Sequence, residues 1–286
     1  MVQGTSNRLE YDTTWHPKPR TDSLLESFVM NRRDILRGFA SVGPLTILSA
    51  SLRGQGLARP VRYEAYGTGP TVIIGSPITL SSAEAIRTGY LDRLTDRYRV
   101  ILMHYPSGDE EATSFTPTRV SDDMLTVADA VGADRFAWYG FSWGAVVGLQ
   151  LAARTNRLTA LICGGWPPLG GPYGRTLAVT EALAAKVPQA QMMVTYYRGL
   201  QNWPEREVVS KFTVPRLTFA GSNDIVAAVG GQTTPIGPVI AQHRDELERM
   251  GWMVRLVDGF GHELVSRPDI VVPLIREFLD RAFLAK

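Results

Sequence analysis

The residue with the clearest chemical potential in this sequence is Ser142, which lies at the centre of the G-F-S-W-G segment 140–144. The apolar and aromatic run at 136–139 suits a buried strand, and the small, apolar residues at 145–154 suit a helix. A strand that enters a helix through G-x-S-x-G forms a nucleophile elbow, a turn so sharp that the serine hydroxyl stands clear of the backbone. The pattern therefore predicts a nucleophilic Ser142, and it predicts that side chains at Gly140 and Gly144 would collide with neighbouring backbone.

The strand, the elbow and the small-residue helix, in this order, resemble the α/β-hydrolase superfamily. The resemblance extends from about Arg59 to the C-terminus and implies an α/β fold with a mostly parallel, doubly wound sheet. Apolar runs and turn residues divide this region into alternating elements. Strands are expected at 62–66, 71–74, 100–103, 136–139, 158–163, 216–220 and 252–257, and helices at 81–97, 121–131, 145–154, 238–250 and 269–284.

The resemblance also implies an acid at the end of a late strand, followed by a histidine in the loop after the last strand. Asp224 has the first position and His262 the second, and His262 alone of the four histidines fits it. In this arrangement His262 is the general base toward Ser142, and Asp224 holds the imidazole in the correct tautomer. Asp258 and Glu263 lie near His262 in the sequence and are competing candidates for the orienting acid.

Two groups are expected to stabilise an oxyanion. The first is the backbone N–H of Trp143, at a helix N-terminus that favours developing negative charge. The second comes, in the family, from the loop after an early strand, which usually carries a His-Gly pair. This chain has Gly-Ser-Pro at 75–77, and Pro77 has no N–H to donate. Ser76, through its backbone or hydroxyl, or the Ile78 N–H is therefore the expected donor, and an ordinary strand-to-loop turn is the alternative.

Other residues are expected around a substrate pocket at the ends of the strands. Trp166 follows strand 158–163, and His104 ends strand 100–103, where the family more often has an acidic residue. A purely structural histidine is the alternative for His104. The segment 166–214 contains helical patches and many aromatic residues, and it falls where the family inserts a lid. Extra helical packing is the alternative for this segment.

Composition limits the possible functions. The 286 residues are 44% apolar, enough for one α/β domain with an extension. The net charge is +2 and no basic stripe is present, so nucleic acid is not an expected partner. The single cysteine, Cys163, is expected to be a buried core thiol. The sequence lacks a Cys/His cluster with metal-ligand spacing and the glycine-rich nucleotide motifs, so it predicts an enzyme that uses neither a metal nor a cofactor on a small-molecule substrate.

The first 58 residues form an N-terminal extension before the domain expected at 59–286. Within it, segment 30–58 contains Arg32 and Arg33, an apolar stretch of about 14 residues and a small-residue ending. This segment resembles a twin-arginine export signal, and its apolar stretch is too short for a stable membrane anchor. The alternative is an amphipathic helix packed on the domain of a cytoplasmic protein.

These residues predict a serine hydrolase that cleaves an ester, lactone or thioester of a small, fairly apolar substrate through an acyl-enzyme on Ser142. A serine nucleophile argues against the dehalogenase and epoxide-hydrolase chemistry of the same fold, which proceeds through an alkyl-enzyme ester. Two alternatives are open. One is an acyltransferase or a biosynthetic elimination or cyclisation enzyme on this fold, and the other is a non-catalytic ligand-binding protein.

Overall fold

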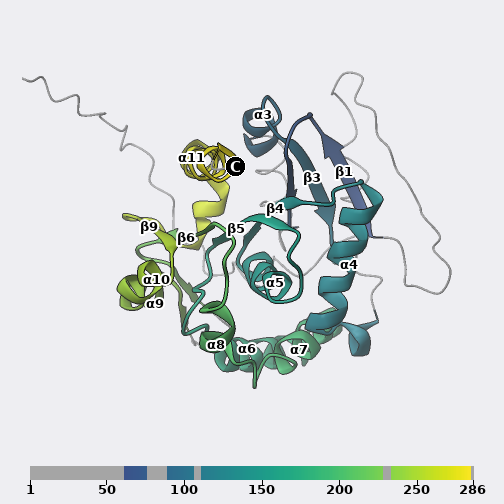
Figure 1. Ribbon diagram of the computed structural model, residues 1–286. Coiled ribbons are helices and arrows are strands. Elements are labelled where there is room, and N and C mark those ends of the chain that lie inside the picture. The colour runs from purple at the N-terminus through teal and green to yellow at the C-terminus, as the bar shows by residue number, and fades with distance from the viewer. Residues whose placement is uncertain (1–60, 76–88, 106–110, 228–232, 285–286) are drawn as a thin grey trace, which may run out of the picture.

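A seven-stranded sheet forms the centre of the computed structural model, which describes residues 61–75, 89–105, 111–227 and 233–284 (Figure 1). The strand order is β1-β3-β2-β4-β5-β6-β9. Only β1 is antiparallel to its neighbour, so the prediction of a mostly parallel sheet is confirmed. The strands are β1 (Arg62–Tyr66), β2 (Thr71–Ile74), β3 (Arg99–His104), β4 (Phe136–Phe141), β5 (Leu158–Gly164), β6 (Arg216–Gly221) and β9 (Trp252–Val257).

Helices cover both faces of this sheet (Figure 1). Strand β4 is buried along its whole length, and its alternate side chains enter two separate apolar clusters. Trp138 belongs to the cluster that contains α5, and Tyr139 belongs to the cluster that contains α11. The first face carries α4 (Pro117–Ala130), α5 (Trp143–Ala152), α9 (Gly237–Gln242) and α10 (Arg244–Arg249), and the second carries α3 (Leu91–Leu94) and α11 (Pro268–Leu284).

Some element boundaries differ from those that the sequence predicts. Helix α4 begins at Pro117 rather than at 121, because the Thr116 side chain caps it and proline suits a first helical turn. The helix expected at 238–250 is two helices, since His243 leaves the helical ψ angle between α9 and α10. A small hairpin of β7 (Ile225–Ala227) and β8 (Thr233–Pro235) was not predicted, because three-residue strands show no clear alternation.

Three helices follow β5 before the chain returns to the sheet at β6. They are α6 (Tyr173–Ala184), α7 (Gln191–Arg198) and α8 (Glu205–Val209), and a short 3-10 turn at Pro188–Ala190 separates α6 from α7. Two further 3-10 turns lie elsewhere in the described chain, at Ala112–Ser114 and His262–Ser266. Figure 1 shows the three helices next to one another, below α5 in this view. The Tyr196 ring of α7 meets the Trp143 ring of α5 edge-on, with centroids 5.4 Å apart. Helix α7 therefore packs against α5.

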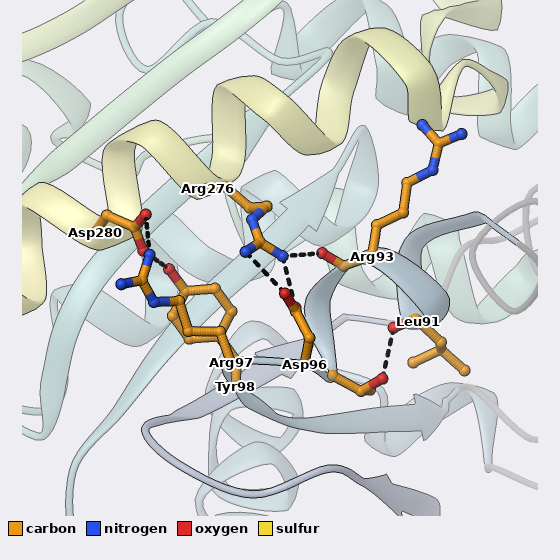
Figure 2. Close-up of polar contacts among 8 residues, drawn as sticks. Leu91, Arg93, Asp96, Arg97, Tyr98, Arg276 and Asp280 are labelled. Atoms are coloured by element: carbon orange, nitrogen blue, oxygen red, sulfur yellow. Dashed lines mark hydrogen bonds and ion pairs between the residues drawn. The ribbon is translucent and has the colours of Figure 1, made fainter.

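Side-chain ion pairs join α11 to the chain around α3 on the opposite face (Figure 2). Arg276 binds both carboxylate oxygens of Asp96, at 2.6 and 3.0 Å, and also donates to the Arg93 carbonyl. Arg97 binds Asp280 at 2.6 Å. In the part of the chain that is described, no helix is long and apolar enough to cross a membrane.

Four predictions concern residues, or side chains, that lie partly or wholly outside the described part of the chain. The extension 1–58, the oxyanion candidate Ser76 and the first part of the helix expected at 81–97, residues 81–88, lie outside the described residues. The backbone of His104 ends β3, but its side chain lies outside the described part. The roles of these residues stay predictions.

Candidate active site

Ser142 occupies the sharp turn between β4 and α5. Its φ and ψ angles are 54° and −119°, and it is the only non-glycine residue with positive φ among the described residues. Such a conformation costs about 1–3 kcal/mol, so the surrounding structure must hold it in place. A Cβ atom on Gly140 would lie 2.0 Å from the Gly144 carbonyl oxygen, which explains the glycine at this position. The equivalent expectation for Gly144 is wrong, because outside its chain neighbours and its own helix a Cβ there would meet nothing closer than the Gly75 oxygen at 3.9 Å.

Asp224 and His262 form a hydrogen-bonded pair at the ends of β6 and β9. His262 Nδ1 lies 3.0 Å from each carboxylate oxygen of Asp224. Asp224 is fully buried, whereas 31% of the His262 side chain is exposed. The backbone also fixes the acid, since its carbonyl accepts the N–H groups of Ile236 and Gly237 at 2.8 and 3.0 Å. The hairpin β7–β8 thus brings the chain back to Asp224, where the two residues after β8 bind the Asp224 carbonyl.

The loop that carries His262 folds back against the elbow. The Phe260 carbonyl accepts the Asn223 N–H at 2.9 Å, and a Cβ on Gly221 would lie 2.0 Å from that same oxygen. The His262 ring then packs on Phe141, the residue before the serine, with ring centroids 5.0 Å apart. Because Nδ1 faces Asp224, the ring nitrogen that this carboxylate does not bind is Nε2.

The two competing acids have other partners. Asp258 accepts a hydrogen bond from the Ser222 hydroxyl at 3.1 Å, and Glu263 accepts one from the Gly261 N–H at 2.8 Å. Among the described residues, the carboxylate that reaches His262 is that of Asp224. The geometry therefore favours Asp224 as the orienting acid.

Trp143 is the first residue of α5, so its backbone N–H has no acceptor within the helix. Its indole ring is enclosed by other rings, stacked with Phe115 at 5.8 Å and Tyr105 at 6.3 Å and edge-on to Tyr196. The Tyr105 hydroxyl in turn donates to buried Asp123 at 2.8 Å. These contacts hold in place the residue whose N–H would face an oxyanion.

Trp166 lies two residues beyond β5 but faces the core. Its side chain is only 3% exposed and packs on Tyr173 and Tyr197. Its role as a wall of the substrate pocket stays a prediction. Cys163 is also buried, and burial raises the pKa of its thiol well above the usual range, as expected for an unreactive core cysteine. The described residues contain no group of three or more His, Cys, Asp or Glu side chains that could hold a metal ion.

Sequence reasoning missed one polar side chain in this region, Glu205 at the start of α8. Its carboxylate accepts the Gly170 N–H at 2.6 Å and the Gly171 N–H at 3.1 Å, and so fixes the loop between β5 and α6. Burial raises the pKa of Glu205. Nothing in the sequence indicates this contact, because an acid in a first helical turn is common and its partners lie about 35 residues away.

Comparison with known proteins gives distant similarities. No family model matches the chain. RutD of Agrobacterium fabrum (strain C58), which carries the name of a putative carbamate hydrolase, is 24% identical over 136 residues. That alignment covers 44% of this chain and 51% of RutD, so the chain matches about half the length of this relative.

Two solved structures resemble most of the chain. MGS-MChE2, an alpha/beta hydrolase enzyme from a sediment metagenome of the Mar Chica lagoon in Morocco, has a TM-score of 0.61 and 16% identity, over 79% of this chain and 97% of that one. A carboxylesterase of the thaumarchaeon Nitrososphaera gargenis has a TM-score of 0.60 and 15% identity, over 79% and 96%. The order of the sheet, the elbow at Ser142 and these similarities together show that this chain has the fold of the α/β-hydrolase superfamily.

Proposed function

We propose that this protein is a serine hydrolase that cleaves an ester-like bond through an acyl-enzyme on Ser142. The observation that carries the proposal is the buried Asp224 carboxylate, bound to His262 beside a strained serine elbow. A fully buried carboxylate is costly unless it is paired, and a serine with positive φ is also unfavourable. Both features have a direct purpose in nucleophilic catalysis, which requires an oriented imidazole and an exposed hydroxyl.

In the first half of the reaction, the Ser142 oxygen attacks the carbonyl carbon of the substrate, and His262 takes the serine proton. Asp224 holds the imidazole by its Nδ1–H and stabilises the imidazolium that forms. The carbonyl oxygen becomes an oxyanion that accepts the Trp143 N–H, and a donor of this kind contributes about 2.7–4 kcal/mol to lowering the barrier. The bond to the leaving group then breaks, and His262 gives its proton to the departing atom.

In the second half, water takes the place of the leaving group. His262 removes a proton from the water, whose oxygen attacks the acyl carbon and forms a second oxyanion. Collapse of this intermediate breaks the bond between the acyl carbon and the Ser142 oxygen. The proton returns from His262 to the serine, and a carboxylic acid leaves the site. The cycle needs no metal or redox group.

The surroundings favour a small substrate with an apolar acyl part. Aromatic rings from Tyr105, which follows β3, and from α5 and α7 gather beside the elbow. The described residues nearest to Ser142 along the chain, Phe141 and Trp143, are themselves aromatic. In this proposal segment 166–214 is the lid that covers the acyl part. The carboxylesterase and the carbamate hydrolase name among the similar proteins support the choice of an ester or a related acyl bond.

The proposal is tested by intact-mass spectrometry after exposure to a fluorophosphonate, which phosphonylates only an activated serine. The wild type should gain the mass of one adduct, and Ser142→Ala and His262→Ala should gain none. Ser222→Ala, which removes an exposed hydroxyl bound to Asp258, is the matched control and should label like the wild type. Turnover of short-chain aryl esters, thioesters, lactones and carbamates then identifies the bond that is cleaved.

Two outcomes would contradict the proposal. A folded wild type that takes no adduct would show that Ser142 is not activated, and it would favour a non-catalytic ligand-binding protein. An adduct on Ser142 without hydrolysis of any substrate, but with acyl transfer to an added alcohol or amine, would favour an acyltransferase.

A further inference from the structure

Trp138 lies in β4, four residues before the serine, and its side chain reaches under the elbow. It is 1% exposed, and its indole Nε1–H donates to the Gly144 carbonyl at 3.0 Å. Gly144 belongs to the first turn of α5. The ring therefore joins the strand before the nucleophile to the helix after it, and the two elements are connected across the strained residue itself.

Two glycines on different elements make room for this ring. A Cβ on Gly148, one turn along α5 from Gly144, would lie 2.6 and 2.7 Å from the indole Cδ1 and Nε1 atoms. A Cβ on Gly75, directly after β2, would lie 2.7 Å from the opposite edge of the ring, at Cζ2. Real Cβ atoms do not approach other atoms so closely, so either side chain would displace the indole.

The same ring also connects the elbow to the end of β2. Gly75 donates its N–H to the Tyr139 carbonyl at 2.8 Å, and its own oxygen lies 3.9 Å from the Cβ position of Gly144. The end of β2, the indole of Trp138 and the first turn of α5 thus form one continuous contact. A movement of the indole would alter the turn that carries both the nucleophile and the Trp143 N–H.

We infer that Trp138 is a positioning residue for the nucleophile elbow, an inference that rests on the proposed role of Ser142. A non-glycine residue at positive φ persists only where its surroundings determine its conformation. The indole does this through a buried hydrogen bond to the helix and through close packing on Gly75 and Gly148. It touches no substrate, and it acts by keeping the Trp143 N–H and the serine oxygen in the geometry that the transition state requires.

The test compares Trp138→Phe with Trp252→Phe. Trp252 is a matched control, because it is a buried tryptophan of another strand, 3% exposed, whose indole N–H has no hydrogen-bond partner in the described part of the chain. Both substitutions remove the same atoms, but only the first removes a bond to the elbow. The measurements are kcat and KM for an aryl ester, the affinity for a boronic acid that forms a tetrahedral adduct, and hydrogen exchange of peptides that cover 140–148.

Trp138→Phe should lower kcat about 10–100-fold, less than the loss of a whole oxyanion donor, and should leave KM within about twofold. Affinity for the boronic acid should fall in parallel with kcat, and exchange at 140–148 should become faster. Trp252→Phe should leave kcat within about twofold and exchange at 140–148 unchanged. If Trp138→Phe does not fold, Gly148→Ala provides the second variant, because it displaces the indole while alanine favours the helix.

An equal loss of kcat in the two tryptophan variants would overturn the inference while leaving the serine labelling, and so the proposed function, intact. Unchanged exchange at 140–148 in Trp138→Phe would overturn it whether or not the protein hydrolyses esters. If the wild type takes no fluorophosphonate label, the proposed function fails, and the positioning role in catalysis fails with it.

Discussion

Two carboxylates of this protein bind a nitrogen partner in opposite surroundings. Asp224 is fully buried and binds His262 at 3.0 Å, whereas 58% of the Asp96 side chain is exposed where it binds Arg276 at 2.6 Å. The shorter contact is the less important one, because water solvates Asp96 whenever Arg276 moves away. Asp224 has no such substitute, so loss of its partner would leave a buried carboxylate unpaired.

The two sites also differ in what holds the acid. The backbone of Asp224 is fixed by the N–H groups of Ile236 and Gly237, so its carboxylate has one direction. Asp96 lies in a cluster of long side chains that meet between α3 and α11 (Figure 2). Arginine side chains can rearrange at little cost in such a cluster. The buried pair is therefore suited to orient a catalytic group, and the surface cluster is suited to join two helices.

The largest effect is expected at the buried acid. Asp224→Asn should lower kcat by roughly 10⁴-fold, because the amide no longer holds the imidazole in the tautomer that accepts the serine proton. Asp258→Asn is the matched control, since Asp258 bonds Ser222 rather than His262, and its kcat should stay within about twofold of the wild type. Both are measured by steady-state kinetics on the best substrate of the ester panel. Similar losses in the two variants would mean that the acid has been wrongly assigned.

The strands of the sheet and the strand–elbow–helix unit could be predicted because their signals are local, whereas the order of the strands in the sheet was not predicted. Apolar runs mark the buried strands. The motif around Ser142 combines the end of a strand with Gly140, a position where any side chain would collide with the backbone. The positions of Asp224 and His262 followed from chain order in a resembled family. Their contact is a property of the fold, because 38 residues separate them and the hairpin that returns the chain to Asp224 has no clear sequence pattern.

Other features could not be predicted because they depend on packing between distant segments. Gly75 and Gly148 look like ordinary turn and helix residues, and only the folded chain shows that both border the ring of Trp138. The same holds for Glu205, whose partners are backbone N–H groups of a remote loop. Every residue except proline has a backbone N–H group, so a sequence motif cannot indicate which of these groups a distant side chain will bind.

Two glutamates of helix α8, Glu205 and Glu207, also differ in burial, and their pKa values shift in opposite directions. Burial raises the pKa of Glu205, although the N–H groups of Gly170 and Gly171, the nearby Tyr173 hydroxyl and the charge of Arg206 each lower it by less. Lys211 lowers the pKa of exposed Glu207 by a hydrogen bond. The two glutamates should therefore affect stability with opposite dependence on pH.

The sign follows from which form the folded state prefers. Folded Glu205 binds its proton more tightly than the unfolded chain does, so the wild type should gain stability relative to Glu205→Gln as the pH falls through the raised pKa. Folded Glu207 prefers its charged form, so the wild type should lose stability relative to Glu207→Gln as the pH falls through the lowered pKa. Urea unfolding of the three proteins across acidic and neutral pH measures both differences. The same slope for both variants would contradict the contrast in burial.

The smallest effect is expected in the surface cluster of Figure 2. Arg276→Met keeps most of the aliphatic stem but removes the bonds to Asp96 and to the Arg93 carbonyl. The free energy of unfolding should fall by at most about 1 kcal/mol, because exposed ion pairs replace contacts with water that are nearly as favourable. The loss should shrink in 1 M salt, where such pairs are screened, and kcat should not change. A larger, salt-independent loss of stability would mean that this arginine contributes most of the energy that holds α11 in place. The apolar contacts of α11 would then contribute less than their burial indicates, although Val271, Ile275 and Leu279 are fully buried.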